Sequence, residues 1–293
     1  MTHQTTYIFW LAALLASVPG LASAHEEGAP FSGAILDPVL LHHAHIENEQ
    51  RLNFFVLKGM RDETGAKHTG YESELELAYG SGNYRYGFEV FVPFLNMADP
   101  KGAGRVTGVG DMEVRPLKYA LLMEPDFVIS TASGFGLPTG RESDGLGEGN
   151  VSFTQYLFGD KAFGNWSITA NLGIGGNLNG EEDVWADYGV GLAYSFIRGV
   201  SFLEVAPVRP EQTWVFAPSL ELVGEHSFRS IDLAHATSIA PAVSFWHVAS
   251  GWQLRAGVLL PIAGQGEADA IFTLQIGNHL NWRSLLSGRG EAE

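Results

Sequence analysis

The chain has 293 residues, and its 17 Lys and Arg against 33 Asp and Glu give a formal charge of −16. It has no cysteine, which excludes a disulfide framework, a thiolate metal site and a cysteine nucleophile. The acidic balance argues against nucleic-acid binding, which needs clustered Lys and Arg. Hydrophobic residues make up 45% of the chain. This is enough for a large core or apolar surface, so extended disorder is excluded as well.

Residues 1–24 have the pattern of a cleaved secretory signal. An apolar run over 7–18 ends at Pro19-Gly20, and Ala22-Ser23-Ala24 supplies the small residues of a cleavage site. The run is shorter than the ~20 apolar residues that span a bilayer, which disfavours the alternative of a membrane anchor. We therefore predict export and a mature chain that starts at His25.

The mature chain divides into three parts. Residues 25–47 form an irregular, histidine-containing lead, for which a plug and a periplasmic segment are alternative interpretations. Residues 48–282 consist of segments that alternate apolar and polar side chains with a period of two, separated by turn residues, which predicts one all-β domain. Residues 283–293 form a polar tail. After the signal, no stretch of 18 apolar residues occurs, so a helical membrane protein is excluded.

The segment 165–174 illustrates the alternation. One face carries Trp, Ile, Ala, Leu and Ile, and the other carries Asn, Ser, Thr, Asn and Gly. The segments 84–94, 184–196, 214–223 and 252–262 repeat this arrangement, and every charge in them lies on the polar face. The pattern alone does not say whether the apolar face points into a soluble core or out into lipid.

Three features favour lipid. The segments are longer than the ~5–6 residues of an average strand and match the ~9–11 residues of a tilted membrane-spanning strand. The polar faces carry few charges. Aromatic residues lie near the ends of the apolar faces, as in interfacial girdles: Tyr84, Phe94, Trp166, Tyr194, Phe196, Trp214 and Trp252. We predict an antiparallel up-and-down transmembrane β-barrel in the outer membrane of a Gram-negative bacterium. A secreted soluble β-protein is the alternative.

The strand pattern fits 49–58, 71–79, 84–94, 111–121, 127–137, 150–158, 165–174, 184–196, 200–208, 213–223, 237–246, 252–262 and 270–282. Bacterial single-chain barrels have an even number of strands, and 200–208 is one of the weak segments. We therefore predict twelve strands, with fourteen as the alternative. The longer polar linkers 59–70, 95–108 and 138–149 are predicted to be extracellular, and 80–83 and 122–126 periplasmic.

Two short motifs carry a resemblance to a known family. Gly108-Val109-Gly110-Asp111 opens one strand, and Leu137-Pro138-Thr139-Gly140 closes the next before a glycine-rich loop. In this order they resemble the outer-membrane porin-like family named for the MetA pathway of phenol degradation, over most of 50–282. The resemblance implies a barrel that transports small compounds, often apolar or aromatic, without a defined catalytic site. Barrels of this kind usually end on an aromatic residue read by the barrel assembly machinery, and Trp282 is predicted to serve as an internal version of it.

A set of charged residues is predicted to face the lumen: Glu72, Glu74, Glu76, Arg85, Glu89, Asp111, Glu113, Arg115, Glu204, Glu221 and Arg255. Two interpretations are open. An acidic lumen favours cations and neutral solutes, whereas paired charges brace neighbouring strands. Either way, inward placement avoids the ~2–4 kcal/mol that an Arg at mid-bilayer costs.

Two groups of residues are candidates for a more specific site. His42, His43 and His45 are close enough to share a metal, with Glu47 or His25 completing the shell; a solvated periplasmic segment is the alternative. His247 and Ser250 suggest a barrel-type lipid hydrolase. Their spacing of three places them on opposite faces of an unbroken strand, and no third orienting residue is evident.

The favoured function is an outer-membrane channel or facilitator for the passive passage of small solutes. We predict that it is not an enzyme and needs no cofactor. A structural or plugged barrel without transport is the alternative, and a lipid hydrolase a lesser one. The expected partners are outer-membrane lipid, a small-molecule solute and the barrel assembly machinery, while the solute and the oligomeric state are left open.

Overall fold

The computed structural model describes residues 37–61, 65–99, 104–180, 183–196, 214–228, 236–247, 251–264, 266 and 268–279. Its strands are β1 (Glu49–Arg61), β2 (Lys67–Gly80), β3 (Tyr86–Ala98), β4 (Arg105–Val109), β5 (Met112–Glu124), β6 (Phe127–Leu137), β7 (Ser152–Phe163), β8 (Trp166–Asn177), β9 (Val184–Tyr194), β10 (Trp214–Ser227), β11 (Ala236–His247), β12 (Trp252–Gly264) and β13 (Ala270–His279). A single turn of 3-10 helix, η1 (Glu142–Asp144), precedes β7. In this part of the chain, no helix is long and apolar enough to cross a membrane.

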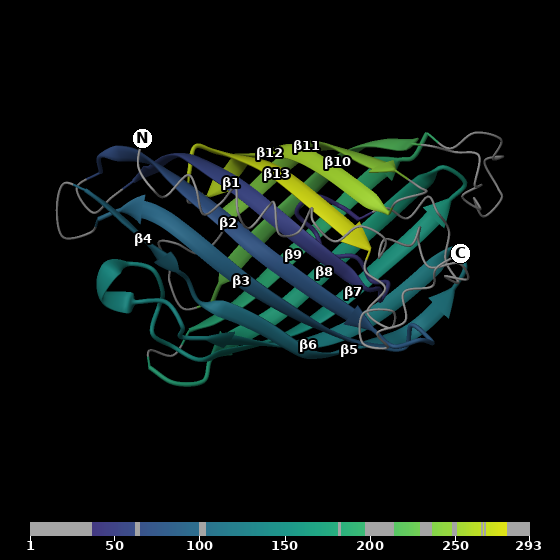
Figure 1. Ribbon diagram of the computed structural model, residues 1–293, viewed down its shortest axis with the longest axis horizontal. Coiled ribbons are helices and arrows are strands. Elements are labelled where there is room, and N and C mark those ends of the chain that lie inside the picture. Colours follow the sequence, from purple (N-terminus) through teal and green to yellow (C-terminus); the bar gives the residue numbers. More distant parts are fainter. Residues whose placement is uncertain are drawn as a thin grey trace, which may run out of the picture.

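The strands close into one antiparallel barrel of twelve wall positions (Figure 1). β1 pairs with β13, from Glu49 opposite His279 to Lys58 opposite Ala270. β4 and β5 share one wall position, because β4 pairs with one half of β3 and β5 with the other. Among the described residues, every strand except β4 pairs with a neighbour on both sides, and β4 pairs with β3 alone. Closure of this kind is what a sheet in hydrocarbon requires. The predicted all-β barrel of twelve strands is thus confirmed.

Some predicted boundaries are wrong. The linker predicted over 95–108 contains the end of β3 and most of β4, which pair with each other from Phe94 opposite Val109 to Ala98 opposite Arg105. The segment predicted from residue 84 starts two residues later, because Tyr84 has a left-handed φ of 54° and belongs to the turn before β3. The predicted strand 200–208 and the residues 280–293 lie outside the described chain, as do residues 1–36.

The apolar face of each strand points away from the lumen. On β8, Leu172 and Ile174 are 44% and 54% exposed, whereas Ser167 and Thr169, on the opposite face, are buried. A soluble protein would show the reverse. Near one end, a row of contacting aromatic rings crosses neighbouring strands, with centroids 4.9–5.6 Å apart: Trp166, Tyr194, Phe196, Phe216 and Phe245. This is the arrangement of an interfacial girdle.

The two ends of the barrel differ in their connections. The short turns 81–85, 125–126 and 164–165 all lie at one end, shown on the right in Figure 1. The segment with η1 lies at the other end. Short turns are typical of the periplasmic side of bacterial barrels, so we call the two ends the periplasmic and the extracellular end.

Residues 37–48, which we call the plug, lie inside the barrel and have no regular secondary structure. Their apolar side chains are buried against the wall. Ala44 packs with Val128, Ala132 and Phe158. Leu41 fills the space over Gly189, where an added Cβ would lie 2.3 Å from its Cδ2 atom. The glycines on the inner wall therefore make room for the plug.

Candidate functional site

Side chains of the barrel wall form hydrogen bonds with the backbone of the plug, which has no regular secondary structure. The Glu221 carboxylate, on β10, accepts hydrogen bonds from the backbone N–H groups of Val39, Leu40 and Leu41 at 2.8, 2.8 and 3.1 Å. The Asn171 amide, on β8, accepts from His42 N–H at 2.7 Å and donates to its carbonyl at 2.6 Å. Buried backbone groups need such partners, so these polar wall residues position the plug.

A first buried charge cluster joins the plug to β1, β2 and β12. Arg51 contacts Glu49 at 2.6 Å, Glu76 at 3.2 Å and Asp37 at 3.3 Å. Arg255 pairs with Asp37 and lies 3.2 Å from Glu49. Because every one of these side chains is buried, each charge depends on its partners in place of water.

A second cluster lies on β3 and β5. Arg115 contacts Glu113 at 2.7 Å and Glu89 at 3.1 Å, and Lys118 contacts Glu89 at 2.7 Å. The Arg115 guanidinium donates to Nε2 of His42 at 3.1 Å, so this nitrogen is an acceptor. Burial, and after it the Arg115 charge, lowers the pKa of the His42 imidazole well below its usual range.

Most of the predicted lumen charges that are described take part in such contacts. Glu76, Glu89, Glu113, Arg115, Glu221 and Arg255 are bound as given above. Glu74 accepts a hydrogen bond from Asn53 at 3.0 Å, and Glu72 is half-buried on the same strand. Arg85 instead lies in the turn before β3, with Nη1 3.4 Å from the Ala120 carbonyl. Glu204 lies outside the described residues.

Several buried lumen charges were not predicted from the sequence: Asp37, Glu49, Arg51, Lys118 and Asp160. Arg51 lies in a predicted strand, and the alternation of side chains along that strand could have assigned Arg51 to the inner face. Lys118 follows a register shift between Val114 and Leu117, and the irregularity moves it to the same face as Arg115. Strict alternation therefore assigns Lys118 to the wrong face.

Asp111 has a different role from a lumen charge. It lies between β4 and β5, and its carboxylate accepts hydrogen bonds from the N–H groups of Gly140 at 2.8 Å and Glu148 at 2.7 Å. Beside it, the Thr139 hydroxyl donates to the Gly110 carbonyl at 2.8 Å. The two motifs that carry the family resemblance therefore contact each other, and together they hold the extracellular segment 138–149.

The three predicted metal-binding histidines separate in the structure. His43 and His45 are stacked, with ring centroids 3.9 Å apart, and their Nε2 atoms face Asp37 and Glu47 at 3.3–3.5 Å. His42 points away from this group, towards Arg115. His25 lies outside the described residues. The cluster is thus formed by two of the predicted histidines, the predicted Glu47, and Asp37, which was not predicted.

The pair proposed for a hydrolase is only partly described. His247 ends β11, and its ring lies 4.7 Å from that of Trp214, near the periplasmic end of the apolar surface. Ser250 lies outside the described residues. The described atoms therefore provide no catalytic arrangement for this pair.

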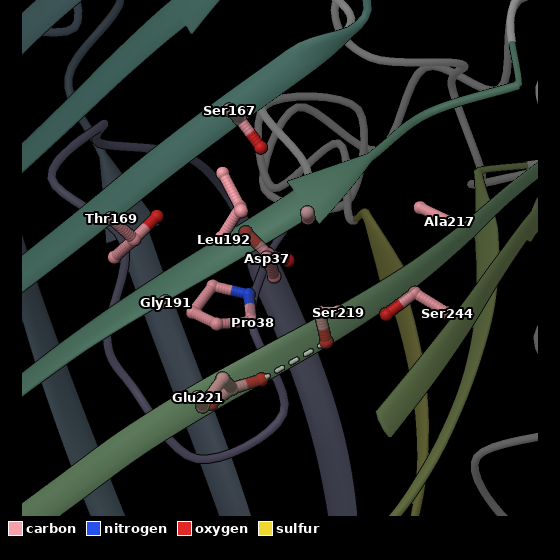
Figure 2. Close-up of a pocket in the computed structure, with 11 residues that line it drawn as sticks. Asp37, Pro38, Ser167, Thr169, Gly191, Leu192, Ala217, Ser219, Glu221 and Ser244 are labelled. Carbon is pink, nitrogen blue, oxygen red and sulfur yellow. Dashed lines mark hydrogen bonds between the residues drawn. The ribbon is translucent and has the colours of Figure 1, made fainter. Parts of the chain in front are cut away.

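A pocket separates the plug from the wall formed by β8 to β11. Figure 2 shows Asp37 and Pro38 on its plug side. The wall side carries mostly small side chains: Ser167, Thr169, Gly191, Ala217, Ser219 and Ser244. The two charged clusters, in contrast, lie on β1–β3, β5 and β12. The charged clusters therefore lie on one side of the lumen. The opposite wall holds the plug through Glu221 and Asn171, and small polar groups line the pocket beside these contacts.

No protein-family model and no curated protein matches the chain. Among solved structures, it is similar to an outer membrane channel from Pseudomonas putida F1, with a TM-score of 0.57 and 17% identity over 83% of this chain and 99% of that one. The NanC porin gives a TM-score of 0.49 at 11% identity, covering 80% of this chain and 99% of its own. The KdgM porin in complex with disordered oligogalacturonate gives 0.47 at 10% identity, with coverage of 80% and 99%. The first likeness shows a shared outer-membrane barrel fold.

Proposed function

We propose that this chain is an outer-membrane channel or facilitator that lets small solutes cross passively. The observation that carries the proposal is the closed barrel with a wall of small hydroxyl-bearing and glycine residues over β8–β11. The pocket between this wall and the plug has room for only about one water molecule, so passage requires the plug to move. On this proposal the solute passes beside the plug, and a shift of the plug widens the path. No catalytic step is required.

The chemistry of the lining suggests which solutes cross. Ser and Thr hydroxyls offer donors and acceptors, and the charges near the path, Asp37 and Glu221, are acidic. A lining of this kind favours neutral and cationic solutes over anions. The resemblance to the MetA-pathway family adds small apolar or aromatic compounds as the substrate class to test first.

A plugged barrel without transport is the second candidate. It is favoured by the burial of the plug and its charged contacts: Arg255 is 1% exposed and Glu49 0%. Breaking such buried pairs is costly. The two candidates differ in whether a solute can cross the barrel. In a channel the plug moves enough to open a continuous path, and in a plugged barrel it does not.

A reversible disulfide between the plug and the wall distinguishes the two candidates. Because the chain has no native cysteine, an introduced pair has no other cysteine in the chain to react with. Cγ1 of Val39 lies 3.3 Å from a Cβ built on Gly257 of β12, which suits a disulfide in a Val39→Cys, Gly257→Cys double variant. We expect the wild-type protein to conduct in planar bilayers. The oxidised double variant should lose conductance and regain it on reduction. Silent wild-type protein would support the plugged barrel, and a conductance unaffected by the disulfide would contradict passage that depends on the plug.

A further inference from the structure

We propose that Asp37, His43, His45 and Glu47 bind a single divalent transition-metal ion inside the plug, with Zn²⁺ as the ion that fits best. All four side chains are buried, and their ligand atoms lie within 4.8 Å of one another. The proposal concerns the plug alone and holds whether or not solutes cross the barrel.

The distances between the ligand atoms match a tetrahedral site. Asp37 Oδ1 lies 3.5 Å from His43 Nε2 and 3.3 Å from His45 Nε2. Glu47 Oε1 lies 3.3 Å from each of the same two nitrogens. Zn–N and Zn–O bonds of about 2.0–2.1 Å place neighbouring ligands of a tetrahedron about 3.3–3.4 Å apart. The four nitrogen-to-oxygen distances therefore agree with those of a tetrahedral site, and the other two pairs of ligand atoms lie within 4.8 Å.

The hydrogen bond of His43 orients its lone pair towards this space. Its Nδ1 atom lies 2.8 Å from the carbonyl oxygen of His45, which can only accept. Nδ1 is therefore the protonated nitrogen, and in a neutral ring Nε2 presents its lone pair to the two carboxylates. The repulsion between this lone pair and the carboxylate oxygens is removed by a metal ion between them or by a second proton on the ring, and the metal-binding experiment below distinguishes the two.

His45 has the outer-shell partner that metal-binding histidines usually have. Its Nδ1 atom lies 3.4 Å from Oδ2 of Asp160, a buried carboxylate on β7. Asp160 is held in turn by the N–H of Ala44 at 2.6 Å and the hydroxyl of Thr169 at 2.8 Å. A carboxylate behind a histidine ligand fixes the ring and raises its basicity.

The surrounding charge also favours a cation. Buried carboxylates here outnumber the arginines that contact them. Asp37, Glu49 and Glu76 contact Arg51 and Arg255, whereas Glu47 lies against His43 and His45, and Asp160 lies behind His45. Burying carboxylates without compensation is costly. A divalent ion supplies positive charge where the excess lies, and two imidazole ligands favour zinc and its neighbours over Ca²⁺ or Mg²⁺.

The experiment measures zinc binding to the full mature chain, refolded in detergent without lipopolysaccharide and without a polyhistidine tag. Titration calorimetry and metal analysis after dialysis should show one zinc per chain. His43→Gln and His45→Gln should each weaken binding by at least a hundredfold. His42→Gln is the matched control, because it changes an adjacent buried histidine that faces Arg115, and it should bind like the wild type. Asp160→Asn should keep the stoichiometry and weaken binding by roughly 10–100-fold.

X-ray absorption on the zinc-loaded wild type keeps the test independent of how the variants fold. It should show two imidazole and two oxygen ligands at about 2.0 Å. A chain that retains no zinc after dialysis, or one whose zinc is unaffected by both His43→Gln and His45→Gln, overturns the proposal. So does a spectrum with fewer than two imidazoles, as binding at His25 would give.

Discussion

At the residue scale, single carboxylates in this barrel join segments that are far apart in sequence. Asp111 connects the β4–β5 junction to Gly140 and Glu148, and Glu221 connects β10 to the plug. In both cases a carboxyl group accepts hydrogen bonds from backbone N–H groups that no strand pairs. Hydrogen bonds to charged groups are worth about 1.5–3 kcal/mol each, so one substitution should loosen the part of a segment that the side chain binds.

Asp111→Ala should loosen the segment 138–149 without opening the barrel. Losing the two hydrogen bonds leaves the Gly140 and Glu148 N–H groups unpaired, and the exposed Arg141 nearby then becomes a better trypsin site. We expect cleavage after Arg141 to accelerate at least tenfold in limited proteolysis. Asp126→Ala, which removes an ion pair to Lys161 at the other end, is the control and should leave this rate unchanged.

At the scale of elements, the plug is held by side chains from many strands of the wall, including β8 and β10, which also line the pocket. It has no backbone ladder with the wall, and its contacts come from side chains of the wall strands and from packing over glycines. Because these side-chain contacts are separate from one another, each of them can be removed without removing the rest. The movement of the plug that we propose therefore depends on a few identifiable groups.

Glu221→Gln should shift the plug towards a more open state. The amide of Gln has one acceptor oxygen, so it cannot satisfy the three N–H groups that the carboxylate binds. Hydrogen exchange of the amides of 39–41 should increase roughly tenfold or more, as expected for a loss of about 1.5–3 kcal/mol. Single-channel conductance should rise in parallel.

The matched control for this change is Glu225→Gln, four residues further along β10 on the same face and exposed. It should leave exchange in the plug unchanged. Faster exchange in Glu221→Gln without any change in conductance would mean that the plug is anchored as described but does not limit passage.

At the scale of the whole molecule, the stability of the barrel depends on apolar side chains that contact lipid on the outside and on paired polar side chains on the inside. The outer surface carries large exposed apolar side chains on nearly every strand, and the inner surface carries the ion pairs. Charge on the outer surface should therefore cost free energy according to its depth in the bilayer.

Leu172→Arg, near the middle of β8, should destabilise the barrel in phospholipid vesicles by about 2–4 kcal/mol. Leu178→Arg, just beyond the extracellular end of the same strand, should cost only about 0–1 kcal/mol. Both positions are exposed, at 44% and 62%. Denaturant titration of vesicle-folded protein measures the difference, and equal effects at both positions would contradict a bilayer centred on β8.

The sequence by itself determined the barrel, because a period of two with apolar residues on one face leaves a chain in lipid few alternatives to a closed sheet. It also placed Glu89, Arg115 and Arg255 on the inner face, because the alternation of side chains can be followed within a single strand. It did not reveal that His42 turns away from His43 and His45, or that Asp37 joins them. Those positions follow from how an irregular segment folds against the wall of a closed barrel, and only the tertiary structure brings residues from β1, β7, β10 and β12 around it.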